Sequence, residues 1–256
     1  MTEFLPVSST GHLILISHWL GLRGEAVKTF EIVIQAGALL AVVGLYRDRV
    51  AEMWRGLFTG QGGGARLVLN VLVSFLPSAV VGLLWHRKIK ATLFGLWPVA
   101  LALFLGGLFM IAIDGWLHAN RSRKPLRRTL ETVTPWEALL VGLSQCLALW
   151  PGTSRSMVTL VTGLMLGWPS KVAAEYSFLL ALPTLGAATA FDLIKSGHLL
   201  LSSTSALSIV IGCGSAAVVA WLAMRGFIVY LRRRGLAPFG WYRIVLAVIV
   251  AVLALR

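Results

Sequence analysis

Long apolar runs separated by short polar segments dominate the chain from one end to the other. A helix that crosses a membrane needs about 20 mostly apolar residues, and six of these runs reach that length. The six predicted spanning helices cover residues 28–46, 66–85, 96–118, 172–195, 203–231 and 238–256. The pattern therefore predicts an all-α integral membrane protein that forms one polytopic domain over residues 1–256.

Two further apolar stretches, 1–21 and 134–168, are each interrupted by a polar segment. The first interruption runs from Pro6 to His12 and the second from Pro151 to Ser156. Broken polar backbone is tolerated at membrane depth only where protein or a water-filled cavity surrounds it. Each stretch is therefore predicted to form a re-entrant helical hairpin with its tip inside the protein.

The two interrupted stretches also resemble each other. Residues from Glu3 to Thr10 echo those from Leu147 to Ser154, and a buried acid follows each at a similar distance, Glu31 in one case and Glu175 in the other. We interpret these two acids as structural, bonded to the hairpin backbones.

Three predicted spanning helices separate the two hairpins. Because three is odd, the second hairpin must enter the membrane from the opposite face. This predicts an inverted-topology repeat, with halves of about 1–118 and 134–256 and both polar tips near the midplane.

Composition supports the membrane assignment and limits the partners. The chain has 256 residues, of which 57% are hydrophobic and 13% charged, and its mean hydropathy is +0.82. These values exclude an ordinary soluble domain. The net charge of +13 lies mostly in short loops, so it predicts contact with membrane lipids and gives no reason to expect nucleic acid binding.

The loop charges also predict an orientation. Most lysines and arginines lie in four loops that would share one face, 47–66, 119–133, 169–171 and 232–237. The more positive face of a membrane protein is usually cytoplasmic. The first hairpin is therefore expected to enter from outside and the second from the cytoplasm. No cleavable signal peptide is visible at Met1.

The second polar segment has the features of an anion site. An arginine between two apolar runs is costly in a membrane unless it faces protein, water or an anionic ligand. Pro151 and Gly152 end the incoming helix, and Thr153 or Ser154 can cap a new one, whose first-turn N–H groups would favour an anion. With Arg155, these residues suggest a phosphate cradle. The alternative is a capped kink whose arginine reaches a lipid headgroup.

The first polar segment carries groups that could do chemistry. Ser9 and His12 are three residues apart, so on a helix their side chains share a face, with the Glu3 carboxylate across the turn. Together they supply a nucleophile, a proton carrier and an acid, although serine caps and structural histidines are also common. Opposite Arg155 and a helix N-terminus, this set predicts attack on a phosphorus atom.

Three segments resemble one known family. They run from Thr2 to Leu13, from Lys28 to Gln35 and from Gln145 to Ser156, and they look like those of undecaprenyl-diphosphate phosphatase, also called the bacitracin resistance protein family. The resemblance covers nearly the whole chain. It implies an enzyme that hydrolyses the terminal phosphate of undecaprenyl diphosphate to give undecaprenyl phosphate, which recycles the carrier for cell-wall synthesis and confers bacitracin resistance.

The resemblance also implies roles for individual residues and a cofactor. Ser9 would be the nucleophile, Glu3 the acid and a metal ligand, and His12 a proton-transfer or phosphate-contacting residue. The residues implied to bind the diphosphate are Ser8, Thr10, Gly152, Thr153, Ser154, Arg155 and Ser156. A divalent cation, Mg²⁺ or Ca²⁺, would offset the charge of the leaving group. The site is expected at the outer face of the bacterial inner membrane, and a homodimer is left open.

One departure from the family concerns the beginning of the chain. The family has a helix ahead of this motif, ending in a second glutamate four residues before the position of Glu3. Neither is present in this sequence, and we interpret Met1 as standing where the family has an interior residue. The metal site would then lack one ligand.

Several alternatives remain open on the sequence alone. Water could attack the phosphorus directly, with Ser9 as a binding residue. A lipid phosphate transporter would also use an inverted repeat and anion contacts, but it would not need a hydroxyl, an imidazole and a carboxylate together. A histidine-dependent lipid phosphatase would need a histidine soon after Arg155, and the next one is His198. A purely structural membrane scaffold is the least expected.

Overall fold

The computed structural model describes residues 2–21, 25–120, 128–203 and 205–255, with the side chains of 25–31, 86 and 195–203 outside that description. In these ranges the chain is helical and contains no strand. The α-helices are α1 (Ser9–Trp19), α2 (Glu25–Leu45), α3 (Arg47–Thr59), α4 (Gly62–Leu93), α5 (Leu96–Ala119), α6 (Pro135–Gln145), α7 (Arg155–Met165), α8 (Ser170–Ser203), α9 (Ala206–Arg234) and α10 (Ala237–Ala254), with short 3-10 turns η1 (Leu130–Thr132) and η2 (Cys146–Leu149). The all-α prediction is confirmed.

Five helices in the described ranges are long and apolar enough to cross a membrane. The candidate spans are Gly62–Trp85, Leu96–Ala119, Ser170–Ile194, Ala206–Arg234 and Ala237–Ala254. They match five of the six predicted spanning helices to within a few residues. The sixth predicted span, 28–46, corresponds to α2, whose described apolar part Ile32–Leu45 is shorter. A sixth crossing therefore stays a prediction.

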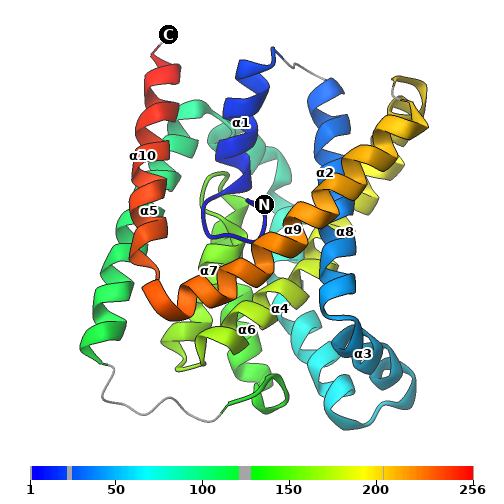
Figure 1. The fold of residues 1–256 in the computed structure, drawn as a ribbon, viewed down its shortest axis with the longest axis vertical. Coiled ribbons are helices and arrows are strands. Elements are labelled where there is room, and N and C mark those ends of the chain that lie inside the picture. Colours follow the sequence, from blue (N-terminus) through cyan, green and yellow to red (C-terminus); the bar gives the residue numbers. More distant parts are fainter. Residues whose placement is uncertain (1, 22–24, 121–127, 204, 256) are drawn as a thin grey trace.

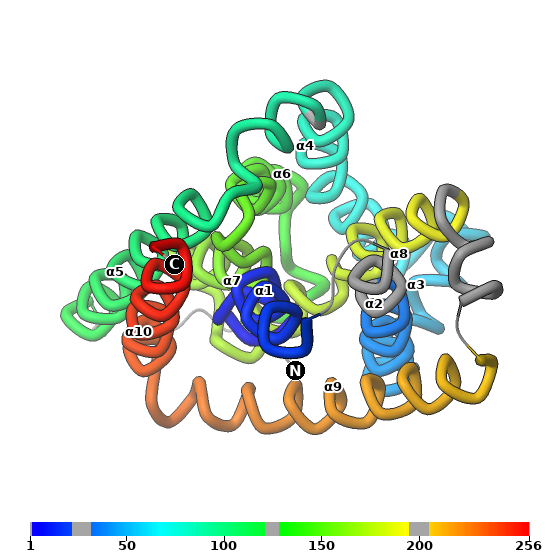
Figure 2. Tube along the Cα trace, turned by 90° about the horizontal axis from the view of Figure 1, so that it is seen from above, coloured from blue at the N-terminus to red at the C-terminus, as the bar shows by residue number. Residues whose placement is uncertain are grey.

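The two short helices α1 and α7 lie in the middle of the protein. Seen from above, α5 and α10 flank them on one side, α4 and α6 lie behind them, α2 and α8 lie on the other side, and α9 runs along the remaining edge (Figure 2). The side view shows α1 rising from the level at which α7 begins (Figure 1). The long helices thus form a frame around the two interrupted stretches.

Burial shows why α7 is stable although it is short. With 11 residues it is about 16 Å long, which is about half the hydrocarbon thickness of a bilayer. Every residue from Ser156 to Val161 is buried, and α8 packs beside it with Ala174, Leu179 and Leu180 fully buried. A helix buried on all sides is a core element, so α7 is enclosed by protein.

Glycines allow α5 and α10 to pack closely, which fixes the position of α10 next to the interrupted stretches. A Cβ atom on Gly107 would lie 2.7 Å from the carbonyl oxygen of Gly240, and a Cβ on Gly240 would lie 2.7 Å from that of Gly107. Small residues that let two backbones approach are typical of helix packing in membranes. Any larger side chain here would push the helices apart.

Candidate active site at the start of the two short helices

Two serines cap the short helices with the same unusual backbone geometry. Ser8 precedes α1 with φ 69° and ψ 106°, and Ser154 precedes α7 with φ 74° and ψ 112°. They are the only non-glycine residues with positive φ among those described. Such conformations cost about 1–3 kcal/mol each and are concentrated at functional sites. The shared geometry marks these two helix starts as equivalent.

The caps also identify which hydroxyls begin the helices. The Oγ atom of Ser8 accepts a hydrogen bond from the N–H of Gly11, and that of Ser154 accepts one from the N–H of Met157, each at 3.4 Å. Of the two predicted caps of the second segment, Ser154 is therefore the one used. The sequence alignment of the two stretches set Thr10 against Ser154. The structure instead makes Ser8 the counterpart of Ser154, so the alignment differs by two residues.

The two interrupted stretches contact each other directly. The hydroxyl of Ser156 donates to the carbonyl oxygen of Leu5 at 2.8 Å. Nη2 of Arg155 donates to the carbonyl oxygen of Glu3 at 3.4 Å and lies 3.8 Å from its carboxylate oxygen Oε1. The two interrupted stretches are therefore in contact where Arg155 and Ser156 meet Glu3 and Leu5.

Arg155 is almost enclosed, with 9% of its side chain exposed. Its Nη1 donates to the carbonyl oxygen of Ser177 at 3.0 Å, while its Nε is buried without a hydrogen-bond partner. A buried donor without a partner is unusual in a folded protein and calls for an explanation. Nε of Arg155 is therefore an unsatisfied buried donor, as is Nε of Arg243.

A second buried arginine, Arg243 of α10, holds the two stretches in place. It is the largest side chain with no exposed surface in the described residues. Its Nη1 donates to the carbonyl oxygens of Thr153 at 3.0 Å and Pro6 at 3.4 Å, and its Nη2 to those of Gly152 at 2.9 Å and Ala102 at 3.1 Å. One guanidinium therefore joins both polar segments and α5. Its position inside an apolar run is a signal that the sequence analysis missed.

Gly152 illustrates how tightly this region is packed. Its φ is +99°, and a Cβ atom would lie 2.7 Å from the carbonyl oxygen of Val99. Only glycine combines that backbone conformation with that contact. Gly152 therefore shapes the loop, and its carbonyl oxygen is already used by Arg243.

His12 makes hydrogen bonds through both ring nitrogens. Its Nδ1 lies 2.7 Å from the carbonyl oxygen of Ser8 and its Nε2 lies 2.6 Å from the hydroxyl oxygen of Tyr242. A carbonyl only accepts, so Nδ1 carries the proton and a neutral ring accepts from Tyr242 at Nε2. Burial lowers the pKa of His12 below its ordinary value of 6.5, although the bond to Ser8 opposes this shift. Tyr242 was not singled out from the sequence.

The predicted site residues divide into two groups in this structure. Ser8 and Ser156 are almost fully buried, and with Ser154 they are bonded within the protein. Ser9, Thr10 and Thr153 are half-buried, and none of their hydroxyls is bonded to a described residue. The second group can meet a ligand without breaking the loop contacts. No hydrogen bond joins Ser9 to His12.

Glu3 is the carboxylate of this site, with 17% of its side chain exposed. Within the described ranges, no group of three or more histidine, cysteine, aspartate or glutamate side chains could hold a metal ion. Glu3 alone suits a cation that takes its other ligands from phosphate and water, as Mg²⁺ often does. The donor set therefore fits a cation that enters with an anionic substrate.

Other acidic and amide residues have structural contacts. Glu175 lies 3.7 Å from Nζ of Lys171 and not on a hairpin backbone, while the side chain of Glu31 lies outside the described residues. Gln145 donates to the hydroxyl of Ser78 at 2.5 Å. Asp114 is buried, and its carboxylate accepts a hydrogen bond from the N–H of Leu236 at 2.8 Å.

Comparison with known proteins places the whole chain among related sequences. Residues 1–249 match the family described as bacitracin resistance protein BacA. A protein of Sorangium cellulosum named undecaprenyl-diphosphatase is 51% identical over 251 residues, which are 98% of this chain and 81% of that protein. Proteins of the same name from Wolinella succinogenes and Acinetobacter baumannii are 45% and 39% identical and are covered over 91% and 92% of their lengths.

Proposed function

Because the chain belongs to the family described as bacitracin resistance protein BacA, we propose that it hydrolyses undecaprenyl diphosphate where α1 and α7 begin. The terminal phosphate is removed to give undecaprenyl phosphate and inorganic phosphate, which recycles the lipid carrier for cell-wall synthesis. The observation that carries this assignment to the site is the contact between Arg155 and Glu3 at the start of two helices.

The site supplies positive charge from three directions. Arg155 carries a guanidinium beside Glu3, and α1 and α7 each begin with the N–H groups of a first helical turn. The first N–H groups of a helix have no partner inside the helix and carry a partial positive charge. The N–H groups of Ser9, Thr10 and Ser156 make no backbone hydrogen bond. They are available for the oxygens of a diphosphate.

In the reaction that we propose, Ser9 attacks the terminal phosphorus. In this route a bond forms between Oγ and phosphorus while the bond from phosphorus to the bridging oxygen breaks, so undecaprenyl phosphate leaves. The hydroxyl proton passes to Glu3 or to His12, and water then releases inorganic phosphate from the phosphoserine. Since no hydrogen bond joins Ser9 to His12 in this structure, the route through His12 requires the ring to leave Tyr242 or the substrate to bridge the two residues.

A divalent cation, Mg²⁺ or Ca²⁺, would be held by Glu3 together with the diphosphate oxygens. When bound, it supplies charge neutralisation for the leaving phosphate. Binding at Glu3 would also weaken the attraction between that carboxylate and Arg155, which leaves the guanidinium freer for phosphate.

The helix packing supports an inverted repeat. In such a repeat, α1, α2, α4 and α5 of the first half correspond in order to α7, α8, α9 and α10 of the second. A contact between α2 and α9 then requires an equivalent contact between α8 and α4, and both are present. By the same correspondence, the contact between α1 and α10 requires an equivalent contact between α7 and α5, and this contact is also present. The shared cap geometry of Ser8 and Ser154 gives the same correspondence.

We further propose that the enzyme lies in the bacterial plasma membrane with its site open to the outer face. The α3–α4 turn and the end of α5 lie at the lower edge of Figure 1, opposite the C-terminus and the end of α1. The lower edge carries the positive loops and would be cytoplasmic. In a chain without Cys146 and Cys213, cysteines at the exposed positions Thr129 and Lys88 should react from opposite sides of the membrane. Labelling from one side would contradict the inverted repeat.

The enzymatic assignment is tested by phosphate release from a long-chain polyprenyl diphosphate in detergent, with and without a chelator. Arg155→Ala should reduce turnover about 100-fold or more, because a preorganised charged donor would be lost. Arg225→Ala removes an arginine that packs on Trp221 at the surface of α9, so it serves as the matched control. Near-normal turnover in a folded Arg155→Ala protein would exclude this location of the site.

A further inference from the structure

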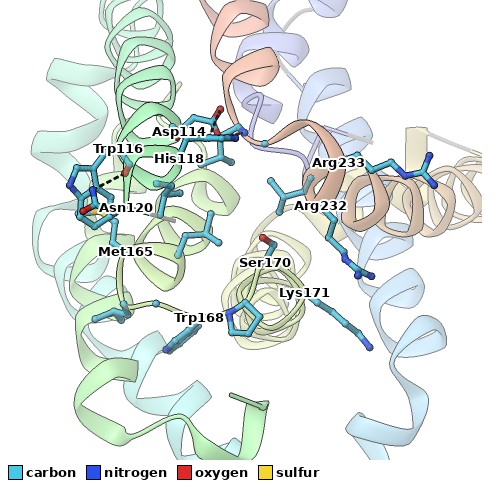
Figure 3. Close-up of a pocket in the computed structure, with 18 residues that line it drawn as sticks. Asp114, Trp116, His118, Asn120, Met165, Trp168, Ser170, Lys171, Arg232 and Arg233 are labelled. Atoms are coloured by element: carbon cyan, nitrogen blue, oxygen red, sulfur yellow. Dashed lines mark hydrogen bonds and ion pairs between the residues drawn. The ribbon is translucent and has the colours of Figure 1, made fainter. Parts of the chain in front are cut away.

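A cavity at the other end of α7 has no part in the proposed reaction. Its volume is about 1020 Å³, and it is an open cavity lined by the ends of α5, α7 and α9 and by the start of α8 (Figure 3). Its polar lining consists mainly of Asp114, His118, Asn120, Ser170, Lys171 and Arg232, together with Arg233. Because α7 is about 16 Å long, this end cavity is well separated from Arg155 at the start of the helix.

The lining of the end cavity is positively charged. Lys171, Arg232 and Arg233 are permanent cations, and Asp114 is the carboxylate among the lining residues. Asp114 is already engaged, because its Oδ1 accepts from the N–H of Leu236 at 2.8 Å and its Oδ2 lies 3.8 Å from Nδ1 of His118. An excess of positive charge therefore lies along the α8 and α9 side of the cavity, where the charged ends of Lys171, Arg232 and Arg233 point away from Asp114 and Trp116 (Figure 3).

The cations of this cavity have little internal compensation. Arg232 and Arg233 form no ion pair with any carboxylate in the described ranges. Lys171 lies 3.7 Å from Glu175, but 64% of the lysine side chain is exposed. Exposed pairs of this kind contribute little. Three cationic groups are thus available to an anion that enters from outside.

The cavity also has apolar walls and lies at the depth of lipid headgroups. Three candidate spans end or begin here, since α5 and α9 end at the cavity and α8 starts at it. In Figure 3, Lys171 and Arg232 lie on one side of Ser170, and Trp116 and Asn120 lie on the other. Tryptophans are typical of the membrane interface. The apolar lining residues are Leu117, Leu164, Met165, Leu166, Leu231 and Leu236.

We infer that the end cavity binds the phosphate headgroup of an anionic phospholipid, with the cations on the phosphate and the leucines against the start of its acyl chains. Basic pockets between spanning helices bind headgroups by this combination of charge and apolar contact. A soluble anion would use the cations but would gain nothing from the apolar wall. This site is independent of the proposed reaction.

The test measures by native mass spectrometry how many lipid molecules bind to the purified protein. Binding of dioleoyl phosphatidylglycerol, which is anionic, is compared with binding of dioleoyl phosphatidylcholine, which has no net charge. The variant carries Lys171→Gln and Arg232→Gln. Each cation near a lipid phosphate contributes about fivefold in affinity, so phosphatidylglycerol should bind about 25-fold more weakly. The control carries Arg234→Gln and Arg225→Gln, which remove the same two positive charges from α9 at positions that do not line the cavity.

Three outcomes would overturn the inference. Binding could be equal for the two lipids, the control could weaken it as much as the double variant, or millimolar inorganic phosphate could displace the lipid and show that a soluble anion suffices. Thermal unfolding of each variant identifies loss of structure. Polyprenyl diphosphate hydrolysis in neutral detergent should be unchanged, which separates this cavity from the catalytic site.

Discussion

Nε2 of His12 lies 2.6 Å from the hydroxyl oxygen of Tyr242, and the two rings stack with centroids 5.6 Å apart. The residues are 230 positions apart in the chain, so α10 orients a side chain of α1. Tyr242 is half-exposed, so this contact lies at the surface of the protein.

Tyr242→Phe should lower kcat about two- to tenfold with little change in KM. The variant keeps the stacked ring but removes one neutral hydrogen bond, whose net contribution is about 0.5–1.5 kcal/mol. The measurement is steady-state phosphate release, with Tyr230→Phe on α9 as the control. Unchanged kcat in Tyr242→Phe would mean that His12 does not depend on this contact.

The acid side of the pH profile should report His12. If its neutral ring accepts a proton, kcat/KM falls as the pH drops through its pKa. Burial lowers that pKa, so the midpoint should lie below 6.5. Replacement of His12 by glutamine should abolish this acid limb in whatever activity remains. An acid limb that persists in His12→Gln would assign the titration to another group.

Gly106→Ala should mimic the loss of Arg243. A Cβ at position 106 would overlap the guanidinium of Arg243, and the displaced group could not keep its four carbonyl acceptors. We expect a loss of about 3 kcal/mol, since each hydrogen bond to a charged group contributes about 1.5–3 kcal/mol. Both the thermal unfolding temperature and kcat should fall.

The control for this change is Gly115→Ala on the same helix, where a Cβ atom meets nothing within 4 Å. It should be neutral or slightly stabilising, because alanine favours helix over glycine by about 1 kcal/mol. Equal effects of the two substitutions would show that Gly106 acts through α5 itself and not through Arg243.

Ser154→Gly should be more stable than Ser154→Ala. Alanine removes the capping hydrogen bond, which costs about 1 kcal/mol of folding stability, and it keeps the strained positive φ. Glycine also removes the capping hydrogen bond, but it adopts a positive φ without strain. The difference should be about 1 kcal/mol or more in reversible unfolding in detergent, and the same order is expected at Ser8. The reverse order would argue against strain at these caps.

Ser9→Ala separates the two chemical routes. If Ser9 is the nucleophile, turnover should fall about a thousandfold or more, and acid quenching of the wild type should trap phosphate on Ser9. Retention of a tenth or more of the wild-type rate would favour direct attack by water, with Ser9 as a binding residue.

Five spanning helices were predictable to within a few residues, because length and hydropathy decide such segments. The segment 47–66 was predicted to be a loop, but most of it forms α3 (Arg47–Thr59), a helix whose polar residues hide it from a search for apolar runs. The breaks at Pro6 and Pro151 were equally clear. The caps were harder, since three consecutive hydroxyl residues, 8–10, can all cap a helix and the choice depends on a backbone angle that composition does not specify.

The contacts of α10 could not be predicted for a different reason. An arginine inside an apolar run is visible in the sequence, but its acceptors at Pro6 and Gly152 are set by how α10 packs on α5. The same holds for Tyr242 and for the burial of Asp114, which follow from the position of the α9–α10 turn. Contacts over such separations depend on the complete fold.

The bond from Arg243 to Pro6 has a consequence for biosynthesis. The loop before α1 leaves the ribosome long before α10, because Pro6 and Arg243 are 237 residues apart. Until α10 is inserted, the carbonyl oxygens of Pro6, Gly152 and Thr153 lack their common donor, and His12 lacks Tyr242. A nascent chain thus carries α1 and α7 long before α10 can join the loops that precede them, and the two polar segments are fixed to each other through Arg243 only once α10 is inserted.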